Sequence, residues 1–194
     1  MRNLIIDSHC HAWATWPYEP PVPDADTRGR VEQLRFEMDR HGVDQALIVC
    51  AQIEKNPANN AYVADCCARA PQRLLQLVDL DSRWSTRYHT PGVAGRLQAM
   101  LERWSPVGFT HYLRDEDDGA WLISPEGLAL FTLATERQLL ASIHCRPYQQ
   151  PAIRALAERF PSVPILIHHL GHPQVGSAED LQQILASARL PNIY

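Results

Sequence analysis

The residues best suited to chemistry stand close to the start of the sequence, in the run Asp7-Ser8-His9-Cys10-His11. A short apolar run precedes them, which predicts a β-strand. Alternate side chains of a strand point to the same face, so the sequence predicts that Asp7, His9 and His11 project together. Imidazole nitrogens and a carboxylate are suitable ligands for a divalent metal ion. The other interpretation is a buried polar strand end whose histidines satisfy each other.

The rest of the chain predicts a regular alternation of strands and helices. Apolar runs predict the strands, while capping residues, prolines at the first helical position and helically spaced apolar residues predict the helices. Strict alternation with short connections predicts an α/β fold with a parallel sheet and right-handed crossovers. The strands after the first are predicted over residues 46–50, 74–80, 107–113, 141–145 and 164–169, and residues 191–194 are predicted to begin a seventh. The helices are predicted to run from residue 26 or 27 to 41, from 56 to 69 and from 91 to 103, and to begin near 124, 151 and 177.

This pattern favours a (β/α)8 TIM barrel, whose usual length is about 250 residues. The 194 residues supply six βα units and the start of a seventh. We therefore expect one TIM-barrel domain over residues 1–194, incomplete because its C-terminal part is missing. An open doubly wound sheet is the alternative, and the incomplete barrel is favoured because the chain ends inside an element.

Most of the histidines lie where such a barrel performs chemistry, at the carboxyl ends of its strands. His9 and His11 end the first predicted strand, His111 lies near the end of the fourth, and His144 ends the fifth. The sixth strand ends in His168-His169, with His172 just beyond. This placement favours a metal site over the purely structural interpretation.

Three side chains near this rim have two interpretations each. Alternation lets only one of His168 and His169 point into the barrel, and the apolar pattern does not choose between them. Arg146 could hold a substrate carboxylate through two hydrogen bonds, or it could form a salt bridge across the rim. Trp13 begins a loop rich in aromatic residues and proline, which is either a substrate wall or a surface connection.

Charge and hydrophobicity limit the kinds of binding partner that the sequence predicts. The net charge of −4 provides no basic surface for nucleic acid, and no apolar run reaches the length of a membrane span. The start of the chain does not resemble a secretory signal. The five cysteines include no C-x-x-C pair, so they are expected to be reduced thiols of a cytoplasmic protein, with Cys10 and Cys145 facing the core. A small-molecule substrate is the expected partner, and a homo-oligomer is left open.

Taken in order, these motifs resemble the amidohydrolase superfamily. The motif Asp7-x-His9-x-His11, a histidine ending strand five, and the run from Ile167 to Pro173 carry the resemblance. More narrowly, they are similar to the amidohydrolase-related branch of lactonases and metal-dependent non-oxidative decarboxylases. The stretches Asn59-Asn60 to Asp79 and Val107-Gly108-Phe109 resemble the same branch.

The resemblance implies a TIM barrel that holds one divalent metal ion, zinc in first place and manganese in second. His9, His11 and His144 would be its ligands, His169 the strand-six ligand or acid–base group, and Asp7 a further catalytic group. It also implies an aspartate ending strand eight, which this sequence does not contain, so the activity of this chain is in question. No lysine ends strand four, which argues against a carbamate-bridged pair of metals, and some lactonases of this branch work without metal. The side chains expected to contact substrate are Trp13, His111, Arg146 and His172.

Three functions follow from these residues and the resemblance. The first is a hydrolase that opens a lactone or similar carbonyl substrate with metal-activated water. The second is a metal-dependent decarboxylase of an aromatic or unsaturated acid. The third is an inactive fragment that retains the fold.

Overall fold

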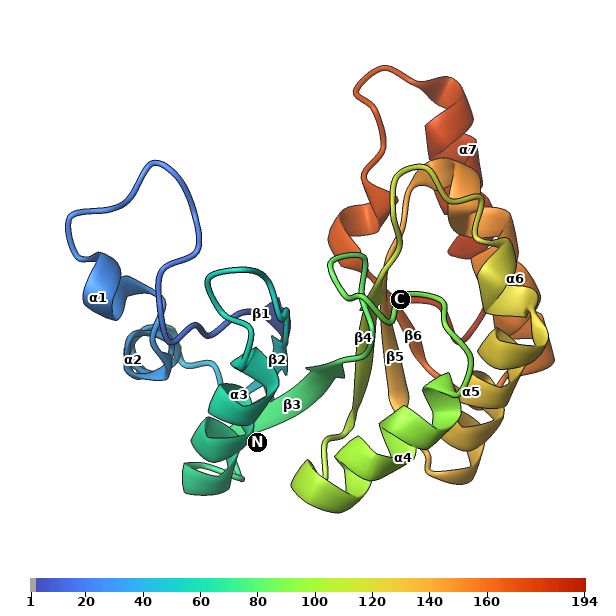
Figure 1. Ribbon diagram of the computed structural model, residues 1–194. Coiled ribbons are helices and arrows are strands. Elements are labelled where there is room, and N and C mark those ends of the chain that lie inside the picture. The colour runs from blue at the N-terminus through green and yellow to red at the C-terminus, as the bar shows by residue number, and fades with distance from the viewer. Residues whose placement is uncertain (1–2) are drawn as a thin grey trace. The chain divides into compact units, whose positions relative to one another are not determined.

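The computed structural model of the protein describes residues 3–194. Contacts within the chain divide it into two compact units, Met1–Asp79 and Leu80–Tyr194. Six parallel strands alternate with helices along the sequence, three strands in each unit, as the apolar pattern predicts (Figure 1). That the chain forms one domain stays a prediction.

The first unit is built on three parallel strands in chain order, because β2 pairs with both β1 and β3. Its strands are β1 (Ile6–Cys10), β2 (Gln45–Val49) and β3 (Leu74–Asp79). Its helices are α1 (Ala25–Arg28), α2 (Val31–His41) and α3 (Asn59–Arg69).

A bulge interrupts β1 inside the histidine motif. Asp7 pairs with Ala46 of β2, whereas Cys10 pairs with Ile48, so three steps along β1 correspond to two along β2. A bulge of this kind breaks the strict alternation of faces and re-aims the side chains beside it. The expectation that Asp7 shares the face of His9 and His11 stays a prediction, because the bulge interrupts the alternation on which it rests.

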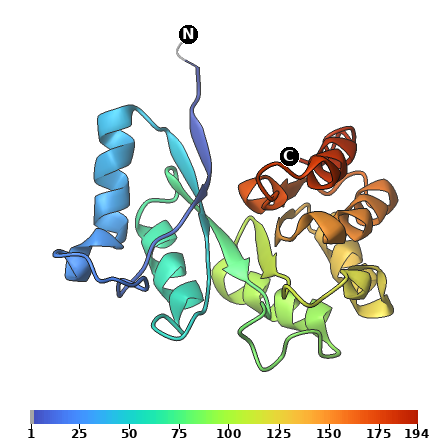
Figure 2. The same ribbon diagram turned by 90° about the horizontal axis from the view of Figure 1, so that it is seen from above.

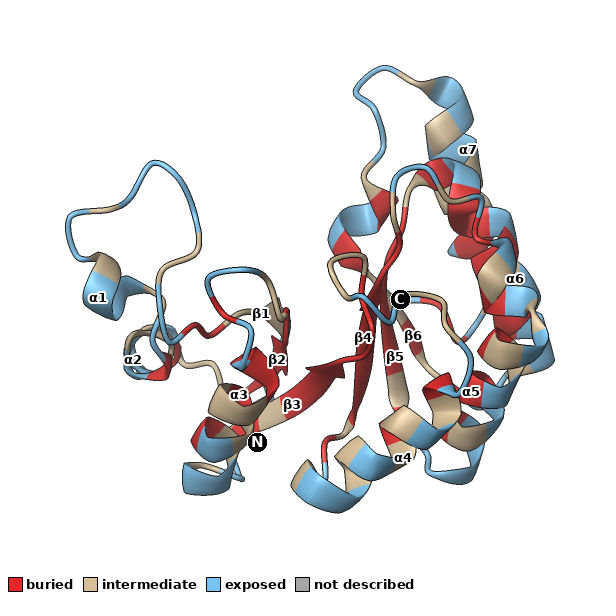
Figure 3. Cartoon of the chain, in the orientation of Figure 1, coloured by how far each residue is buried: buried red, intermediate tan, exposed pale blue. Residues whose placement is uncertain are grey.

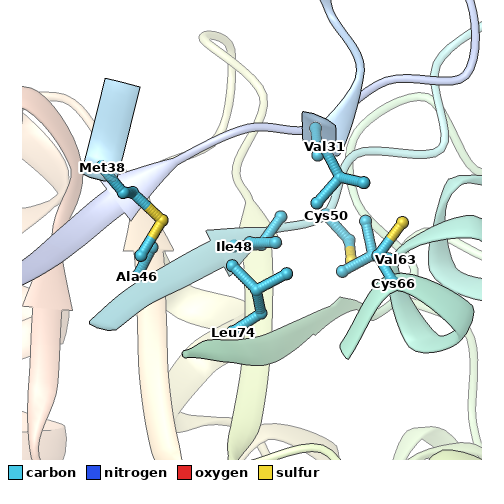
Figure 4. Packing of buried hydrophobic residues seen from close by; sticks show 9 residues of the cluster. Val31, Met38, Ala46, Ile48, Cys50, Val63, Cys66 and Leu74 are labelled. Atoms are coloured by element: carbon cyan, nitrogen blue, oxygen red, sulfur yellow. The ribbon is translucent and has the colours of Figure 1, made fainter. Parts of the chain in front are cut away.

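The core of this unit consists of small and medium apolar side chains from β2, β3 and the two longer helices (Figure 4). Cys10 packs against this cluster and its thiol donates a hydrogen bond to the Leu47 carbonyl, so it faces the core as predicted. The buried members are Ala12, Val31, Met38, Ala46, Ile48, Cys50, Val63, Cys66 and Leu74.

The helix predicted from residue 26 or 27 to 41 is divided into α1 and α2. The break falls at Gly29, whose carbonyl accepts a hydrogen bond of 2.7 Å from the Trp13 backbone. A Cβ at Gly29 would lie 3.0 Å from the Cβ of Trp13, so glycine permits this approach. A contact over sixteen residues of chain thus ends α1, and no local signal predicts it.

Two adjacent asparagines of α3 form hydrogen bonds with backbone groups near the ends of the strands. Asn59 accepts a hydrogen bond from the Ala51 backbone and donates one to the Ala12 carbonyl. Asn60 bonds both the N–H and the carbonyl of Asp79. Both side chains are buried, so their amides satisfy strand-end groups that would otherwise lack partners.

The second unit repeats the arrangement with three parallel strands in chain order. Its helices follow one another along the colour scale from yellow-green to red (Figure 2). Its strands are β4 (Gly108–Tyr112), β5 (Leu140–His144) and β6 (Ile165–Ile167). Its α-helices are α4 (Val93–Trp104), α5 (Pro125–Glu136), α6 (Gln150–Arg159) and α7 (Ala178–Ser187). Its 3-10 helices are η1 (Ala120–Ile123), η2 (Pro147–Gln149) and η3 (His168–Gly171).

Local signals predict the helix starts of this unit well. Ser124 caps α5 by accepting a hydrogen bond from Gly127, and Ser177 caps α7 by accepting one from Asp180. β4 is buried along its whole length (Figure 3), and its outer residue Phe109 packs edge-on against Phe131 of α5. The packing of helices on this face leaves the opposite face of the strands for the site.

The sixth strand is shorter than predicted. It ends at Ile167, and the histidines expected on it lie in η3. The backbone turns because His169, Leu170 and Gly171 all adopt positive φ angles, of 49°, 56° and 72°. Beyond α7, Ile193 forms a parallel bridge with Ile165, so the predicted start of a seventh strand is confirmed.

Over residues 3–194, no helix is long and apolar enough to cross a membrane. All five cysteines are free thiols, as the absence of a paired motif predicts. Cys145 is fully buried, and burial holds the pKa of its thiol well above the ordinary value.

Candidate active site

In the first unit, the structure brings together the residues of the opening motif. The rings of His9 and His11 lie edge to face, with centroids 5.2 Å apart. The Asp7 carboxylate accepts a hydrogen bond of 3.0 Å from the backbone N–H of His9. It also lies close enough to contribute to the raised pKa of the Cys10 thiol, whose main cause is burial.

His11 has a defined tautomer. Its Nδ1 lies 2.7 Å from the Val49 carbonyl oxygen, which can only accept, so Nδ1 carries the hydrogen. The lone pair is then on Nε2. A backbone carbonyl that fixes a ring in this way is the usual partner of a metal-binding histidine.

Trp13 supports this histidine from the side. Its ring stacks on His11 with centroids 5.2 Å apart, and only 4% of the residue is exposed. Its other neighbours include Gly29 of the helix break and Tyr18, whose ring lies edge to face with that of Trp13. The predicted contact of Trp13 with substrate stays a prediction, and its clear role is to hold His11.

In the second unit, His144 lies in a buried group of polar and aromatic side chains. Register pairs Thr110 with Ser142 and Tyr112 with His144, so these four side chains share one face of the strands. The Tyr112 ring stacks on His144 with centroids 5.2 Å apart. His168 completes the group, with its Nε2 2.7 Å from the Ser142 hydroxyl and 3.4 Å from that of Thr110.

His144 and His172 are neighbours and have lowered pKa values. Their ring centroids are 4.6 Å apart. Burial, followed by the neighbouring His172, lowers the pKa of His144 to about 4, and burial, followed by His169, lowers that of His172. Among residues 3–194, no hydrogen-bond partner is found for the buried atoms His144 Nδ1 and His172 Nε2. Both rings are thus neutral at physiological pH, the form that binds metal.

Arg146 forms the salt bridge that was one of its two interpretations. Its Nε and one terminal nitrogen lie 2.8 Å and 3.2 Å from the two carboxylate oxygens of Asp115. This hydrogen bonding is the main cause of the lowered pKa of Asp115. The contact of Arg146 with a substrate stays a prediction.

His111 lies on the other face of β4, because it alternates with Thr110 and Tyr112. Its Nδ1 donates to the Leu80 carbonyl at 2.8 Å, so its Nε2 must accept the hydrogen bond of 3.3 Å from His89. The structure therefore does not bring His111 together with His144. Strand-end position predicted a rim residue, whereas the alternation of β4 assigns it to the outer face.

The two adjacent histidines after β6 differ in exposure and in their neighbours. His168 is 1% exposed and belongs to the group around Ser142. His169 is exposed, and its ring centroid lies 4.9 Å from that of His172. The acid–base role expected of His169 stays a prediction. Alternation along the fifth strand predicts that Ser142 shares the face of His144, and the structure agrees. The stacking of Tyr112 on His144 was not predicted, although alternation along β4 places Tyr112 on the face of Thr110.

The chemistry of these histidines fits a divalent metal ion. The tautomer of His11 carries its lone pair on Nε2, and the buried Nδ1 of His144 has no protein partner among the described residues. Within neither unit, over residues 3–194, do three or more His, Cys, Asp or Glu side chains group around one point. The full ligand set expected for one ion stays a prediction.

Comparison with known proteins identifies the family. The chain matches the Amidohydrolase family over residues 6–194. Nothing among the curated proteins matches it.

Solved structures share the fold. A probable 2-pyrone-4,6-dicarboxylic acid hydrolase from Acinetobacter baumannii, with citric acid bound, has 18% identity and a TM-score of 0.73 over 98% of this chain and 68% of its own. An amidohydrolase from Burkholderia multivorans with bound zinc has 19% identity and a TM-score of 0.69 over the same shares. The 5-carboxyvanillate decarboxylase of Sphingomonas paucimobilis has 16% identity and a TM-score of 0.58, over 87% of this chain and 68% of its own.

These likenesses confirm the predicted fold class, six βα units of a TIM barrel with the start of a seventh. The order of motifs from Asp7 to His172 was the signal that pointed to this family. With a family match over nearly its whole length, the chain belongs to the amidohydrolase family.

Proposed function

We propose that the chain is a metal-dependent hydrolase that opens a lactone or similar small carbonyl substrate. His9, His11 and His144 would hold one divalent ion, zinc in first place and manganese in second. A relative of the same fold contains zinc, which supports the choice. The proposal includes a cytoplasmic location, no nucleic-acid or membrane partner, and leaves self-assembly to measurement.

The observation that carries this proposal is the buried nitrogen of His144. A nitrogen with no protein partner among the described residues costs free energy unless a ligand satisfies it. A pKa of about 4 keeps the ring neutral, so that it can donate its lone pair. The hydrogen bond of His11 Nδ1 to the Val49 carbonyl fixes its tautomer, with the lone pair on Nε2.

A divalent ion held there would polarise a carbonyl group and acidify water. The chain's own residues would transfer the proton and hold the histidines in position. His169 is proposed as the acid–base group that moves the proton, because its ring is exposed and beside His172. Asp7 is proposed as a second carboxylate for the same work. Trp13 holds His11 in place, while Tyr112 packs against His144.

Product analysis on a panel of lactones and aromatic acids tests the proposal. We expect a ring-opened hydroxy acid from a lactone, and loss of that product after chelation or in His144→Ala. Release of carbon dioxide from an aromatic acid would instead identify a decarboxylase, the second candidate, which the decarboxylase among the structural relatives favours. Lactone opening that survives both chelation and the His144→Ala change would exclude a role for metal.

A further inference from the structure

Strand pairing ends just before His11. The bulge interrupts the pairing of β1, and Cys10, opposite Ile48, is the last residue of β1 in register with β2. Beyond this pair, the Nδ1 of His11 donates to the Val49 carbonyl at 2.7 Å. Backbone that leaves a strand has to find hydrogen-bond partners other than the ladder. The side chains that supply these partners therefore decide how firmly the chain around His11 is held.

Asn59 connects the two chain segments that meet at the hydrogen bond between His11 and Val49. Its Nδ2 donates at 2.8 Å to the carbonyl of Ala12, the residue after His11. Its Oδ1 accepts at 2.9 Å from the N–H of Ala51, two residues after Val49. The Asn59 amide is thus a second link between the same two segments, beside the link that fixes the His11 tautomer.

Burial makes this second link firm. Asn59 is 2% exposed, and Ala12 and Ala51 are 1% and 4% exposed, so water does not compete for the two hydrogen bonds. A buried backbone group that lost its partner would be left unsatisfied, which is costly. The amide therefore holds both segments at a defined separation.

Asn56 holds the same segment a few residues farther along. Its Nδ2 donates to the Thr15 carbonyl at 2.8 Å, and its Oδ1 accepts from the Thr15 N–H at 3.1 Å. Between Ala12 and Thr15 lies Trp13, whose ring stacks on His11. The two asparagines thus fix both ends of the short segment that carries this ring.

We propose that Asn59 is a positioning residue for His11, assisted by Asn56, and that both act by holding residues 12–15. Groups outside the ligand set fix the ring orientation and the tautomer of metal-binding histidines. Here they act through the backbone, so that Nδ1 of His11 stays on the Val49 carbonyl and the lone pair stays on Nε2. This inference rests on the proposed function, because it concerns the binding of the same divalent ion.

Asn60 provides a matched control in the same helix. Like Asn59 it is buried, and its amide also binds two backbone groups, the N–H and the carbonyl of Asp79. Asp79 ends β3, which lies across β2 from β1. Asn59→Ala and Asn60→Ala should therefore lower the urea midpoint of unfolding by similar amounts, whereas only Asn59→Ala should affect His11.

Nitrogen NMR of the metal-free chain reports the His11 tautomer without requiring metal or turnover. At about pH 8 the imidazoles are neutral, and the chemical shifts of the two ring nitrogens distinguish one tautomer from a mixture. The wild type and Asn60→Ala should show one tautomer, with the hydrogen on Nδ1. Asn59→Ala should show a mixture of the two tautomers, and Asn56→Ala should change in the same direction by less.

Competition with a chromophoric chelator measures the dissociation constant for zinc. Asn59→Ala should raise this constant about tenfold or more, the usual loss for groups that orient a metal ligand. Asn60→Ala should leave it within about twofold of the wild type. Asn56→Ala keeps the test decisive if Asn59→Ala does not fold, because Thr15 is exposed and its release disturbs the core less. This variant should raise the constant about threefold or more.

Two results would overturn the positioning role. One is a single tautomer with the hydrogen on Nδ1 in both Asn59→Ala and Asn56→Ala. The other is an equal loss of zinc affinity in Asn59→Ala and Asn60→Ala, since a general loss of stability would then explain both.

Failure of this inference is distinguishable from failure of the proposed function. A wild-type chain that binds no zinc would overturn the metal site, while the tautomers of the variants would still decide whether Asn59 positions His11. Tight zinc binding that neither Asn59→Ala nor Asn56→Ala weakens would overturn the positioning role and keep the metal site.

Discussion

At the scale of the residue, the protonation and tautomer of each imidazole follow from its immediate partners. His11 and His111 both donate from Nδ1 to a backbone carbonyl, yet only His11 is in the opening motif. His111 uses its second nitrogen to accept a hydrogen bond from His89, and its contact with substrate stays a prediction. The residue type alone could not separate these two roles, because the difference lies in the face of the strand.

The adjacent histidines His168 and His169 should respond differently to the same change. His169→Gln should lower kcat about 10²- to 10⁴-fold with little effect on stability, because its ring is exposed and proposed to move a proton. His168→Gln should lower the free energy of unfolding by about 1–3 kcal/mol, because it disturbs the buried bond to Ser142. Steady-state kinetics and urea denaturation measure the two effects. A fully active His169→Gln chain beside an inactive but stable His168→Gln chain would reverse the assignment.

The stability of the protein should depend on pH through His89. Burial, followed by the neighbouring His111, lowers the pKa of His89 to about 4, against about 6.5 in an unfolded chain. Between these values the unfolded state binds more protons, so the free energy of unfolding should fall as the pH drops from about 6.5 to about 4. The fall is less than about 1.4 kcal/mol per pH unit for this group, because solvent screens a half-buried imidazole.

Urea denaturation across this pH range measures the effect. His89→Asn should reduce the slope, and asparagine is suitable because His89 has a φ angle of 55°, which asparagine tolerates. His41→Asn, which changes an exposed histidine at the end of α2, should keep the wild-type slope. An unchanged slope in His89→Asn would show that other groups, such as His144, carry the dependence.

At the scale of the element, the sequence predicts those features that depend on near neighbours. The serine caps of α5 and α7 are local, so they were predictable, and so was the alternation of strands and helices. The bulge in β1 depends on the register with β2, and the break between α1 and α2 depends on Trp13. Such contacts join segments far apart in the chain, and no window of sequence contains both partners.

Gly108, at the start of β4, shows why one position in a strand must be glycine. A Cβ there would lie 2.1 Å from the Leu140 carbonyl oxygen on β5. Gly108→Ala should therefore lower the free energy of unfolding by about 3 kcal/mol, since neither strand can move freely. Gly95→Ala on α4 is the control, because a Cβ there meets nothing within 4 Å.

Gly95→Ala should raise the free energy of unfolding by about 0.5–1 kcal/mol, because alanine is more favourable than glycine inside a helix. Denaturation midpoints of the two variants provide the comparison. Equal stability of Gly108→Ala and wild type would mean that β4 and β5 are not as closely spaced as described.

At the scale of the whole molecule, the order of the motifs along the chain was more informative than any one of them. The pair His9 and His11 alone was compatible with a structural role, whereas the sequence of strand-end histidines led to the amidohydrolase family. The family and the fold were therefore predictable. The substrate was not, because the side chains that surround His144 depend on strand register and packing, as the stacking of Tyr112 on His144 shows.

The central claim is that His9, His11 and His144 hold a divalent ion, and elemental analysis of the purified chain tests it most directly. We expect about one zinc or manganese ion per chain, and a loss of most of it in His144→Ala, with His41→Ala, at an exposed position, as the control. A wild-type chain with no more metal than His144→Ala, after incubation with either ion, would contradict the account.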